Sequence, residues 1–365
     1  PAASKVYLVD RGLSIGGYGE LSIAQLREDN DNIIDAQRVI LYVGYKFTDR
    51  IIFNSEIEFE HGFTGDNLNG QEGEVAVEFA SLDFLITDYL NLRGGLLLMP
   101  IGIINEVHEP TTFFGVLRPD VERFVIPTTF RENGAGVFGD LSRFVPGNLT
   151  YRAYVVNSLD SRGFAASDIR DARPSGNRAE FDDPAFVSRV EYDPFPGLRF
   201  GGSFFIGQTG QNQKVMGDTI DGLFQLYEAD VQFQWRGLEA RGLVVYTFLD
   251  DADLINLNNG FMGDDSVGEE MYGWYVEAGY NVLSLADLHP YFQYLAPFVR
   301  FEKYDTQFEV PSGFMRDPAN DRRLLTVGLS YKPIPNVVIK ADYQFRDNDA
   351  DSADNQFNLG LGYVF

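Results

Sequence analysis

Hydrophobic and polar positions alternate along most of the chain. Val39, Leu41 and Val43 share one parity, whereas Arg38 and Lys46 lie on the other. Runs of about ten residues with a period of two are typical of β-strands that have one face in lipid. An α-helix does not fit, because charged residues recur at every second position along whole segments. The pattern therefore predicts strands along nearly the whole sequence.

We expect about sixteen such strands, an even number as in outer-membrane barrels. They are predicted at residues 12–27, 35–48, 51–61, 74–87, 90–99, 133–140, 148–157, 184–192, 198–209, 223–236, 238–249, 270–283, 291–304, 323–332, 336–346 and 355–365. Short connections (49–50, 88–89, 143–148, 193–197, 236–237, 284–290, 333–336) alternate with longer ones (28–34, 61–73, 100–132, 158–183, 210–222, 250–269, 305–322, 347–354). This segregation of loop lengths favours an all-β transmembrane antiparallel barrel over a soluble sandwich.

Residues 100–132 follow neither an alternating nor a helical period. Connections longer than about 12–15 residues are uncommon unless they are functional. We expect this third long loop to fold into the barrel and to set the width of the pore. Its candidate constriction residues are Arg118, Arg123, Arg131, Glu106, Glu109, Asp120 and Glu122, and we hypothesise that its arginines dock on an acidic wall.

The polar parities of the strands supply the expected pore lining. Its members are Glu56, Glu58, Glu60, Glu74, Glu78, Arg38, Arg93, Arg152, Arg189 and Arg199. An acidic wall that faces a basic arc would create a transverse field, which orients dipolar solutes and penalises apolar ones. The alternative is that these side chains are simply solvated lumen residues. Both interpretations require water inside the barrel.

Composition narrows the class of protein. The net charge of −25 argues against nucleic-acid binding, and the lack of Cys excludes disulfides and thiolate metal sites. No apolar run approaches the ~18–20 residues of a membrane helix. No linker divides the sequence, so we expect one domain over 1–365, with 1–11 as a periplasmic segment. The small residues at its start suit a mature end left after removal of a signal peptide.

The last strand carries a distinct local pattern. Phe357, Leu359, Leu361, Tyr363 and Phe365 occupy one parity up to the final residue. This arrangement resembles the signal that the bacterial barrel-assembly machinery reads, so that machinery is an expected partner. The location expected from all of these features is the outer membrane of a Gram-negative bacterium, with the bilayer and lipopolysaccharide as surroundings.

The third long loop resembles that of the phosphate-selective porin family. The matching residues are Pro100-x-Gly102, Glu122-Arg123, Pro127 and Arg131-x-x-Gly134. The resemblance implies a trimer of sixteen-stranded barrels, passive diffusion, and an anion preference in the specialised members. Lysines do not cluster in this loop and the mouth loops are acidic, so no phosphate-binding residue carries over and the preferred solute stays open.

Other candidate sites are weaker. Asp347-Asn348-Asp349-Ala350-Asp351-Ser352 has carboxylates at calcium-loop spacing, but Ser352 replaces the required glycine. We interpret the acidic loops as a solvated rim, the alternative being Ca²⁺ or Mg²⁺ that bridges the rim to lipopolysaccharide. His61, His108 and His289 lie far apart in sequence, so we predict no cofactor, no zinc site and no catalytic pair.

The favoured function is an outer-membrane porin for passive diffusion of small hydrophilic solutes or ions. The alternatives are an anion- or phosphate-preferring channel and an adhesive or structural barrel. An outer-membrane hydrolase is disfavoured because histidines are scarce and no nucleophile motif is present.

Overall fold

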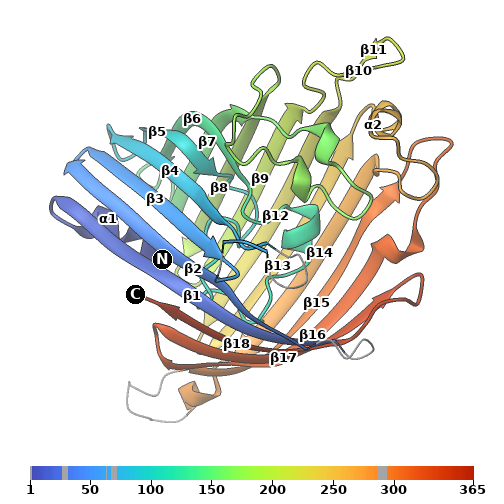
Figure 1. Cartoon of the computed structure of the whole chain (residues 1–365). Helices are drawn as coiled ribbons and strands as arrows, with labels where there is room; N and C mark the ends of the chain where they lie inside the picture. Colours follow the sequence, from blue (N-terminus) through green and yellow to red (C-terminus); the bar gives the residue numbers. More distant parts are fainter. Residues whose placement is uncertain (1, 27–31, 63, 67–71, 286–293) are drawn as a thin grey trace.

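The computed structural model describes residues 2–26, 32–62, 64–66, 72–285 and 294–365. Within these ranges sixteen antiparallel strands form one closed barrel (Figure 1). The barrel strands are β1 (Gly12–Leu26), β2 (Asn32–Thr48), β3 (Ile51–Glu60), β4 (Val75–Leu85), β5 (Asn91–Leu98), β6 (Arg131–Asp140), β7 (Asn148–Asn157), β8 (Pro184–Phe195), β9 (Leu198–Gln208), β12 (Leu223–Trp235), β13 (Leu238–Leu249), β14 (Glu270–Tyr280), β15 (Tyr294–Glu309), β16 (Asp321–Ile334), β17 (Val337–Asn348) and β18 (Gln356–Val364).

Every strand pairs with its neighbours in sequence, and the first strand pairs with the last. Leu21 of β1 faces Leu361 of β18 in that closing register. Closure gives each backbone group a partner and leaves no edge, which is the condition for spanning lipid with strands. The predicted all-β, sixteen-stranded barrel is confirmed.

The two faces of the wall differ as the alternation predicts. Val39, Val244 and Ile339 belong to an exposed apolar parity, whereas Glu58, Asp230 and Lys340 on the other parity are buried inside. An apolar outer band with a polar interior is the arrangement of transmembrane barrels. In the part of the chain described here, no helix is both long and apolar enough to cross a membrane.

The strand boundaries agree with the predicted ones within a few residues, with local extensions. β15 continues to Glu309, beyond the predicted end at 304, and β2 begins at Asn32 rather than at 35. Several predicted features fall wholly or partly outside the described residues: the start of the 291–304 strand, most of the 284–290 connection, parts of the 28–34 and 61–73 loops, residue 27 and His289.

The connections contain short elements that the alternation does not reveal. They are the hairpin β10 (Lys214–Val215) with β11 (Asp218–Thr219), α2 (Ala252–Asn259), η3 (Ser161–Gly163), η4 (Arg170–Ala172), η5 (Val282–Leu285), η6 (Pro318–Asn320) and the π-helical turn η2 (Val121–Val125). Each is too short to show a clear 3.6-residue period, so strand patterning alone does not detect it.

One β-bulge reverses the alternation in β4. The register between β3 and β4 shifts after Glu56, which faces Phe79, while Ile57 faces Val77. Glu78 is therefore the extra residue, and Phe79 packs inward against Tyr42 instead of facing lipid with Val77. Plain alternation from Val75 and Val77 predicts Phe79 on the lipid side. The structure shows that this prediction is wrong, because the inserted residue flips every later side chain of the strand.

The chain before β1 packs against the inner wall near the short turns. It comprises η1 (Ala2–Ser4) and α1 (Lys5–Leu8). Asn54 donates to the carbonyl of Ala3 at 2.9 Å, and Tyr7 donates to Asp83 at 2.6 Å. Val6 is buried, so this short segment is anchored by both polar and apolar contacts.

Candidate functional site inside the barrel

The loop of residues 100–132 contacts the β3–β4 wall through His108. The His108 Nε2 atom lies 3.4 Å from Glu56 Oε1 and 3.2 Å from Glu78 Oε2. Arg131, at the end of the loop, places Nη1 3.3 Å from Glu78 Oε1. Three close contacts between ionisable side chains therefore join the loop to two neighbouring strands.

The same loop also contacts strands further round the barrel. The backbone N–H of Val116 donates to Asp342 of β17 at 2.6 Å, and Lys340 donates to the carbonyl of Gly115 at 2.8 Å. Further along, the Val121 N–H donates to Glu302 of β15 at 3.2 Å. In the closed order β17 lies four strands from β3 and β15 lies six, so the contacts of the loop are spread over much of the inner wall.

Two polar side chains fix the shape of the loop itself. Asn105 donates to the carbonyls of Met99 and Phe130 at 2.7 and 3.0 Å, which holds the two ends of the loop together. Glu122 accepts from the Ile104 N–H at 2.8 Å and from the Tyr275 hydroxyl of β14 at 2.6 Å. Burial raises the pKa of Glu122 to about 7, because the charged form loses its hydration.

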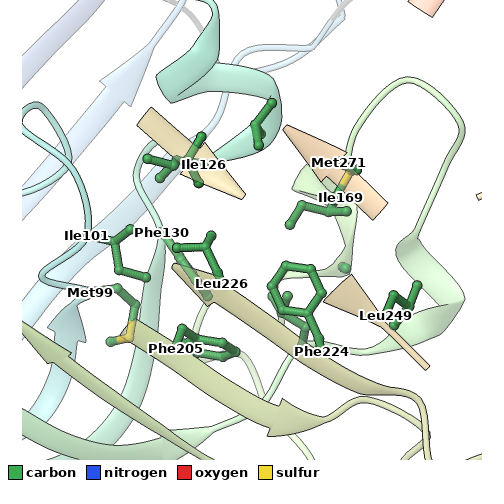
Figure 2. Close-up of a cluster of buried hydrophobic side chains, with 14 of the residues drawn as sticks. Met99, Ile101, Ile126, Phe130, Ile169, Phe205, Phe224, Leu226, Leu249 and Met271 are labelled. Atoms are coloured by element: carbon green, nitrogen blue, oxygen red, sulfur yellow. The ribbon is translucent and has the colours of Figure 1, made fainter. Parts of the chain in front are cut away.

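Apolar side chains fill the space between this loop and strands β9 to β15. Phe130 lies 5.4 Å from Phe205 between ring centroids, and Ile126, Leu226 and Phe224 belong to the same buried cluster (Figure 2). Each fully buried aromatic or aliphatic side chain contributes about 1.5–3 kcal/mol. The interior therefore contains a hydrophobic core as well as charged groups.

A second loop, residues 158–183, joins this core. Its residues Phe164 and Ile169 are buried in the cluster, with Ile169 beside Met271 in Figure 2. Arg173 donates to the carbonyl of Thr128, and Thr306 of β15 donates to the carbonyl of Ala166 at 2.6 Å. The sequence pattern gave this segment only as a long polar connection and did not predict its contact with loop 100–132.

The predicted constriction residues differ in what they contact. Arg131 reaches Glu78, whereas Arg123 pairs with Asp120 of its own loop at 3.1 Å rather than with the acidic wall. Arg118 donates to Thr128 at 2.5 Å. The acidic members are placed as follows: Glu106 pairs with Arg152 at 2.6 Å, Glu122 binds Tyr275, and Glu109 is buried.

The predicted acidic wall lies mostly beneath the loop. Glu56, Glu58 and Glu78 are 1%, 2% and 0% exposed, whereas Glu60 is half-buried and Glu74 is exposed just before β4. The three innermost carboxylates thus face protein groups instead of open space.

The predicted basic residues have carboxylate partners nearby. The pairs are Arg38 with Glu58 (3.6 Å), Arg93 with Asp83 (2.7 Å), Arg152 with Glu106 (2.6 Å), Arg189 with Glu228 (3.0 Å) and Arg199 with Asp193 (2.7 Å). These partners lie on adjacent or nearby strands or on the loop, because adjacent side chains on one face of a sheet are within contact distance. The charges of this arc are therefore compensated locally rather than across the barrel.

Cavities lie inside the barrel towards both of its ends, and a further one of about 230 Å³ is lined by Arg93, Glu106 and Arg152. A cavity of about 360 Å³ near the short turns is lined by Thr112, Arg199, Glu239 and Arg241. A cavity of about 400 Å³ near the long loops is lined by Asp120, Arg123, Phe124, Tyr304, Arg322 and Arg346. Residues 112–124 of the loop contribute to both, so this part of the loop lies between them.

Positive charge gathers where the two loops meet. Burial and the neighbouring Arg123 lower the pKa of Arg170, and burial and Arg170 lower the pKa of Arg173 to about 10. Burial and Arg38 likewise lower the pKa of Arg118. Burial is the larger cause in each case, and the neighbouring positive charge adds to it.

Sequence reasoning missed a buried cluster of Glu56, Glu78 and His108. One nitrogen or oxygen of each residue lies within 4.8 Å of the others. The residues come from β3, β4 and the loop, so their spacing in the sequence does not indicate that they lie together. His61 is elsewhere, paired with Asp35 at 2.8 Å.

The acidic segment after β17 has partners of its own. Arg323 lies 3.4 Å from Asp347 and also contacts Asp349. Asn348 accepts from the Ser352 N–H at 2.9 Å. Two of the carboxylates at calcium-loop spacing thus share one arginine, which offsets one of their two negative charges.

Comparison with known proteins places the chain among barrels of this kind. No protein-family model matches it. OmpF of Salmonella typhi in complex with daunomycin has a TM-score of 0.61 at 14% identity, with 98% of each chain covered. The anion-selective porin from Comamonas acidovorans has a TM-score of 0.58 at 12% identity, over 97% of this chain and 99% of that one. The outer-membrane channel DcaP of Acinetobacter baumannii gives 0.55 at 11%, over 97% of both.

At such identities the likeness establishes the fold, and membership of the phosphate-selective family stays a prediction. A relative in sequence comes from Aquifex aeolicus (strain VF5), where it is described as an uncharacterized protein. The two sequences are 40% identical over an alignment of 378 positions, which spans all of this chain and 83% of the relative. The chain therefore belongs to the same protein family as this Aquifex aeolicus protein, and it has the fold of the outer-membrane porins.

Proposed function

We propose that this protein is an outer-membrane porin through which small hydrophilic solutes diffuse passively. The observation that carries the proposal is the pair of polar-lined cavities on either side of residues 112–124, inside a closed barrel with an apolar outer face. A solute that crosses the barrel would enter one cavity, pass the loop and leave through the other. Loop 100–132 is then the constriction.

The contacts of the loop suit a fixed constriction. It is held by charged and polar groups of β3, β4, β15 and β17 and by an apolar cluster towards β9–β14. A loop anchored on several sides keeps a constant pore width, which passive diffusion requires. No conformational cycle or energy source is needed.

The orientation of the barrel in the membrane and its oligomeric state are proposed together with this function. We place the short turns and segment 1–11 on the periplasmic side, and the long acidic loops outside, near lipopolysaccharide. A homotrimer is proposed from the resemblance of the loop to phosphate-selective porins. It is also supported by fold neighbours such as OmpT of Vibrio cholerae, which is described in a trimer form.

The test is single-channel recording of the purified protein in a planar bilayer under a KCl gradient. We expect stepwise, ohmic conductance with a reversal potential that reports the charge preference. Absence of conductance from protein that is folded, judged by its strand-rich circular dichroism and heat-modifiable mobility, would contradict the porin proposal and favour a structural or adhesive barrel.

A preference for anions is the second candidate, and the cavity near the long loops favours it. Arg322 lines that cavity beside the stacked rings of Phe124 and Tyr304, each 5.6 Å from its guanidinium carbon. Among the described residues it has no carboxylate within 4.0 Å. Arg170 and Arg173 add positive charge nearby.

The sign of the reversal potential separates the two candidates. An anion-preferring pore would also show current that falls when phosphate is added, and Arg322→Gln would weaken both effects. A cation preference in the wild-type protein would remove this candidate and leave general diffusion.

A further inference from the structure

The cluster of Glu56, Glu78 and His108 has the geometry of a metal-binding site. The His108 Nε2 atom lies 3.4 Å from Glu56 Oε1 and 3.2 Å from Glu78 Oε2. Ligand atoms about 2.0–2.2 Å from a tetrahedral zinc ion stand roughly 3.2–3.6 Å from one another. The two distances fall in that range, and all three side chains are buried.

The histidine is oriented for this role by its other nitrogen. His108 Nδ1 lies 2.9 Å from the carbonyl of Asn105, in the same loop. With Nδ1–H donating to that carbonyl, the lone pair of the neutral ring is on Nε2, which faces the two carboxylates. Metal-ligating histidines almost always have such a partner on the second nitrogen. Asn105 is itself fixed by its bonds to Met99 and Phe130.

A buried carboxylate oxygen points into the cluster. Glu78 Oε2 is fully buried and no hydrogen bond of good geometry reaches it among the described residues, although His108 Nε2 lies 3.2 Å away and Glu58 lies beside the same carboxylate. The hydrogen bond of that nitrogen is instead formed with Glu56. A buried carboxylate oxygen without a good hydrogen bond is unfavourable because it has lost its hydration, and a bound cation would supply the missing interaction.

The nearby arginines do not saturate the carboxylates. Arg131 contacts the other oxygen of Glu78, and Arg38 contacts Glu20 and Glu58. Among the described residues, Glu56 has no guanidinium within 4.0 Å, and its carboxylate contacts His108. Arg118 donates to Thr128. Negative charge therefore remains at the point where the three ligand atoms meet.

We propose that Glu56, Glu78 and His108 bind one divalent transition-metal ion, Zn²⁺ by preference, which fastens loop 100–132 to the β3–β4 wall. A donor set of one imidazole and two carboxylates suits zinc, and water would complete a fourth position. Mg²⁺ and Ca²⁺ prefer six or more oxygen ligands and do not suit this set. The role is structural, since the ion would join a loop to two strands.

The experiment measures metal bound to tag-free, folded protein in detergent. The protein is stripped with EDTA, equilibrated with ZnCl₂, passed over a desalting column and analysed by atomic emission. We expect about one zinc per chain, together with a higher midpoint of thermal unfolding than in the EDTA-treated sample. Protein that retains no zinc after this treatment would overturn the proposal, and the imidazolium would then bridge the carboxylates alone.

Two variants separate this site from adventitious binding. His108→Gln should reduce zinc affinity at least about tenfold, as expected for loss of a ligand. His61→Gln removes an exposed histidine with a carboxylate partner and should leave the stoichiometry unchanged. Equal zinc content in wild type and His108→Gln, or loss of zinc in His61→Gln, would contradict the proposal.

X-ray absorption of the wild-type protein at the zinc edge tests the site even if His108→Gln does not fold. The wild-type spectrum should fit one imidazole and otherwise oxygen ligands. A fit with two imidazoles or with none would place the ion elsewhere, and the proposed site would be wrong.

Discussion

The two flanks of loop 100–132 are held by different forces. Towards β3, β4 and β17 the contacts are charged or polar, as between Val116 and Asp342 or between Arg131 and Glu78. Towards β9–β14 the loop packs through side chains such as Phe130 and Ile126 on an apolar cluster. Polar contacts are directional and fix the position of the loop, whereas apolar burial is not directional and supplies most of the stabilisation.

This difference predicts different outcomes when each flank is disrupted. Loss of apolar volume should destabilise the whole interior, because two loops and several strands share one cluster. Loss of one polar contact should release the loop locally while the barrel stays closed. The predictions below separate these effects.

The largest effect is expected for Phe205→Ala. Phe205 is fully buried on β9 and contacts both Phe130 and Phe224. Removing a buried ring costs about 3–5 kcal/mol through lost burial and the cavity left behind. Urea unfolding in lipid vesicles would measure the loss.

Phe200→Ala is the matched control for Phe205→Ala. Phe200 lies on the same strand with the opposite parity and is exposed on the outer face. Its truncation should cost clearly less. Equal losses for the two variants would show that the apolar cluster does not stabilise the interior.

A smaller, local effect is expected for Asp342→Ala. The carboxylate accepts from the Val116 N–H at 2.6 Å, and a hydrogen bond to a buried charge is worth about 1.5–3 kcal/mol. Hydrogen exchange of the 112–124 amides should accelerate roughly thirtyfold, which corresponds to about 2 kcal/mol. Asp351→Ala, in the exposed loop before β18, is the control and should leave that exchange unchanged.

Glu122 should make stability depend on pH. Its pKa in the folded protein is about 7, above the ordinary 4.5, so the folded state keeps the proton to higher pH than the unfolded state. Stability is therefore fully present below about pH 4.5 and falls as the pH rises to about 7, by at most about 1.4 kcal/mol per pH unit. Thermal unfolding of wild type and Glu122→Gln at pH 5 and pH 8 would measure this, and an equal pH response in both would exclude Glu122 as the source.

The wall of the barrel could be predicted from the sequence, and most of its interior could not. Alternation such as that of Val39, Leu41 and Val43 defines strands and faces locally. The partners of His108 depend on barrel closure and on the bulge at Glu78, which bring together residues far apart in sequence. No local pattern contains that information.

One strand sequence indicates that an apolar surface inside the barrel is covered. In β12 both parities carry apolar residues, with Leu226 on one and Val231 on the other. A strand that is apolar on both faces indicates that something covers its inner face. The structure shows loops 100–132 and 158–183 in that place, against Leu226 and Phe224.

The smallest effect on stability, and the one most specific for transport, is expected for Arg123→Ala. Arg123 lines the cavity near the long loops, its side chain is 26% exposed, and Asp120 keeps a second cation, Arg346, at 3.7 Å when Arg123 is removed. Without the Arg123 guanidinium, the cavity keeps the Asp120 carboxylate and loses one positive charge. The reversal potential under a KCl gradient should therefore shift towards cation preference, while thermal stability changes little.

Arg162→Ala is the control for Arg123→Ala, because it removes the same charge from an exposed pair with Asp160 that lines neither cavity. A shift in Arg123→Ala alone would place the transport path beside the partly exposed Arg123 rather than beside the buried Glu56 and Glu78. Equal shifts in both variants would mean that the overall charge at the long-loop end, and not the loop inside the barrel, sets selectivity. The polar flank would then serve only to anchor the loop.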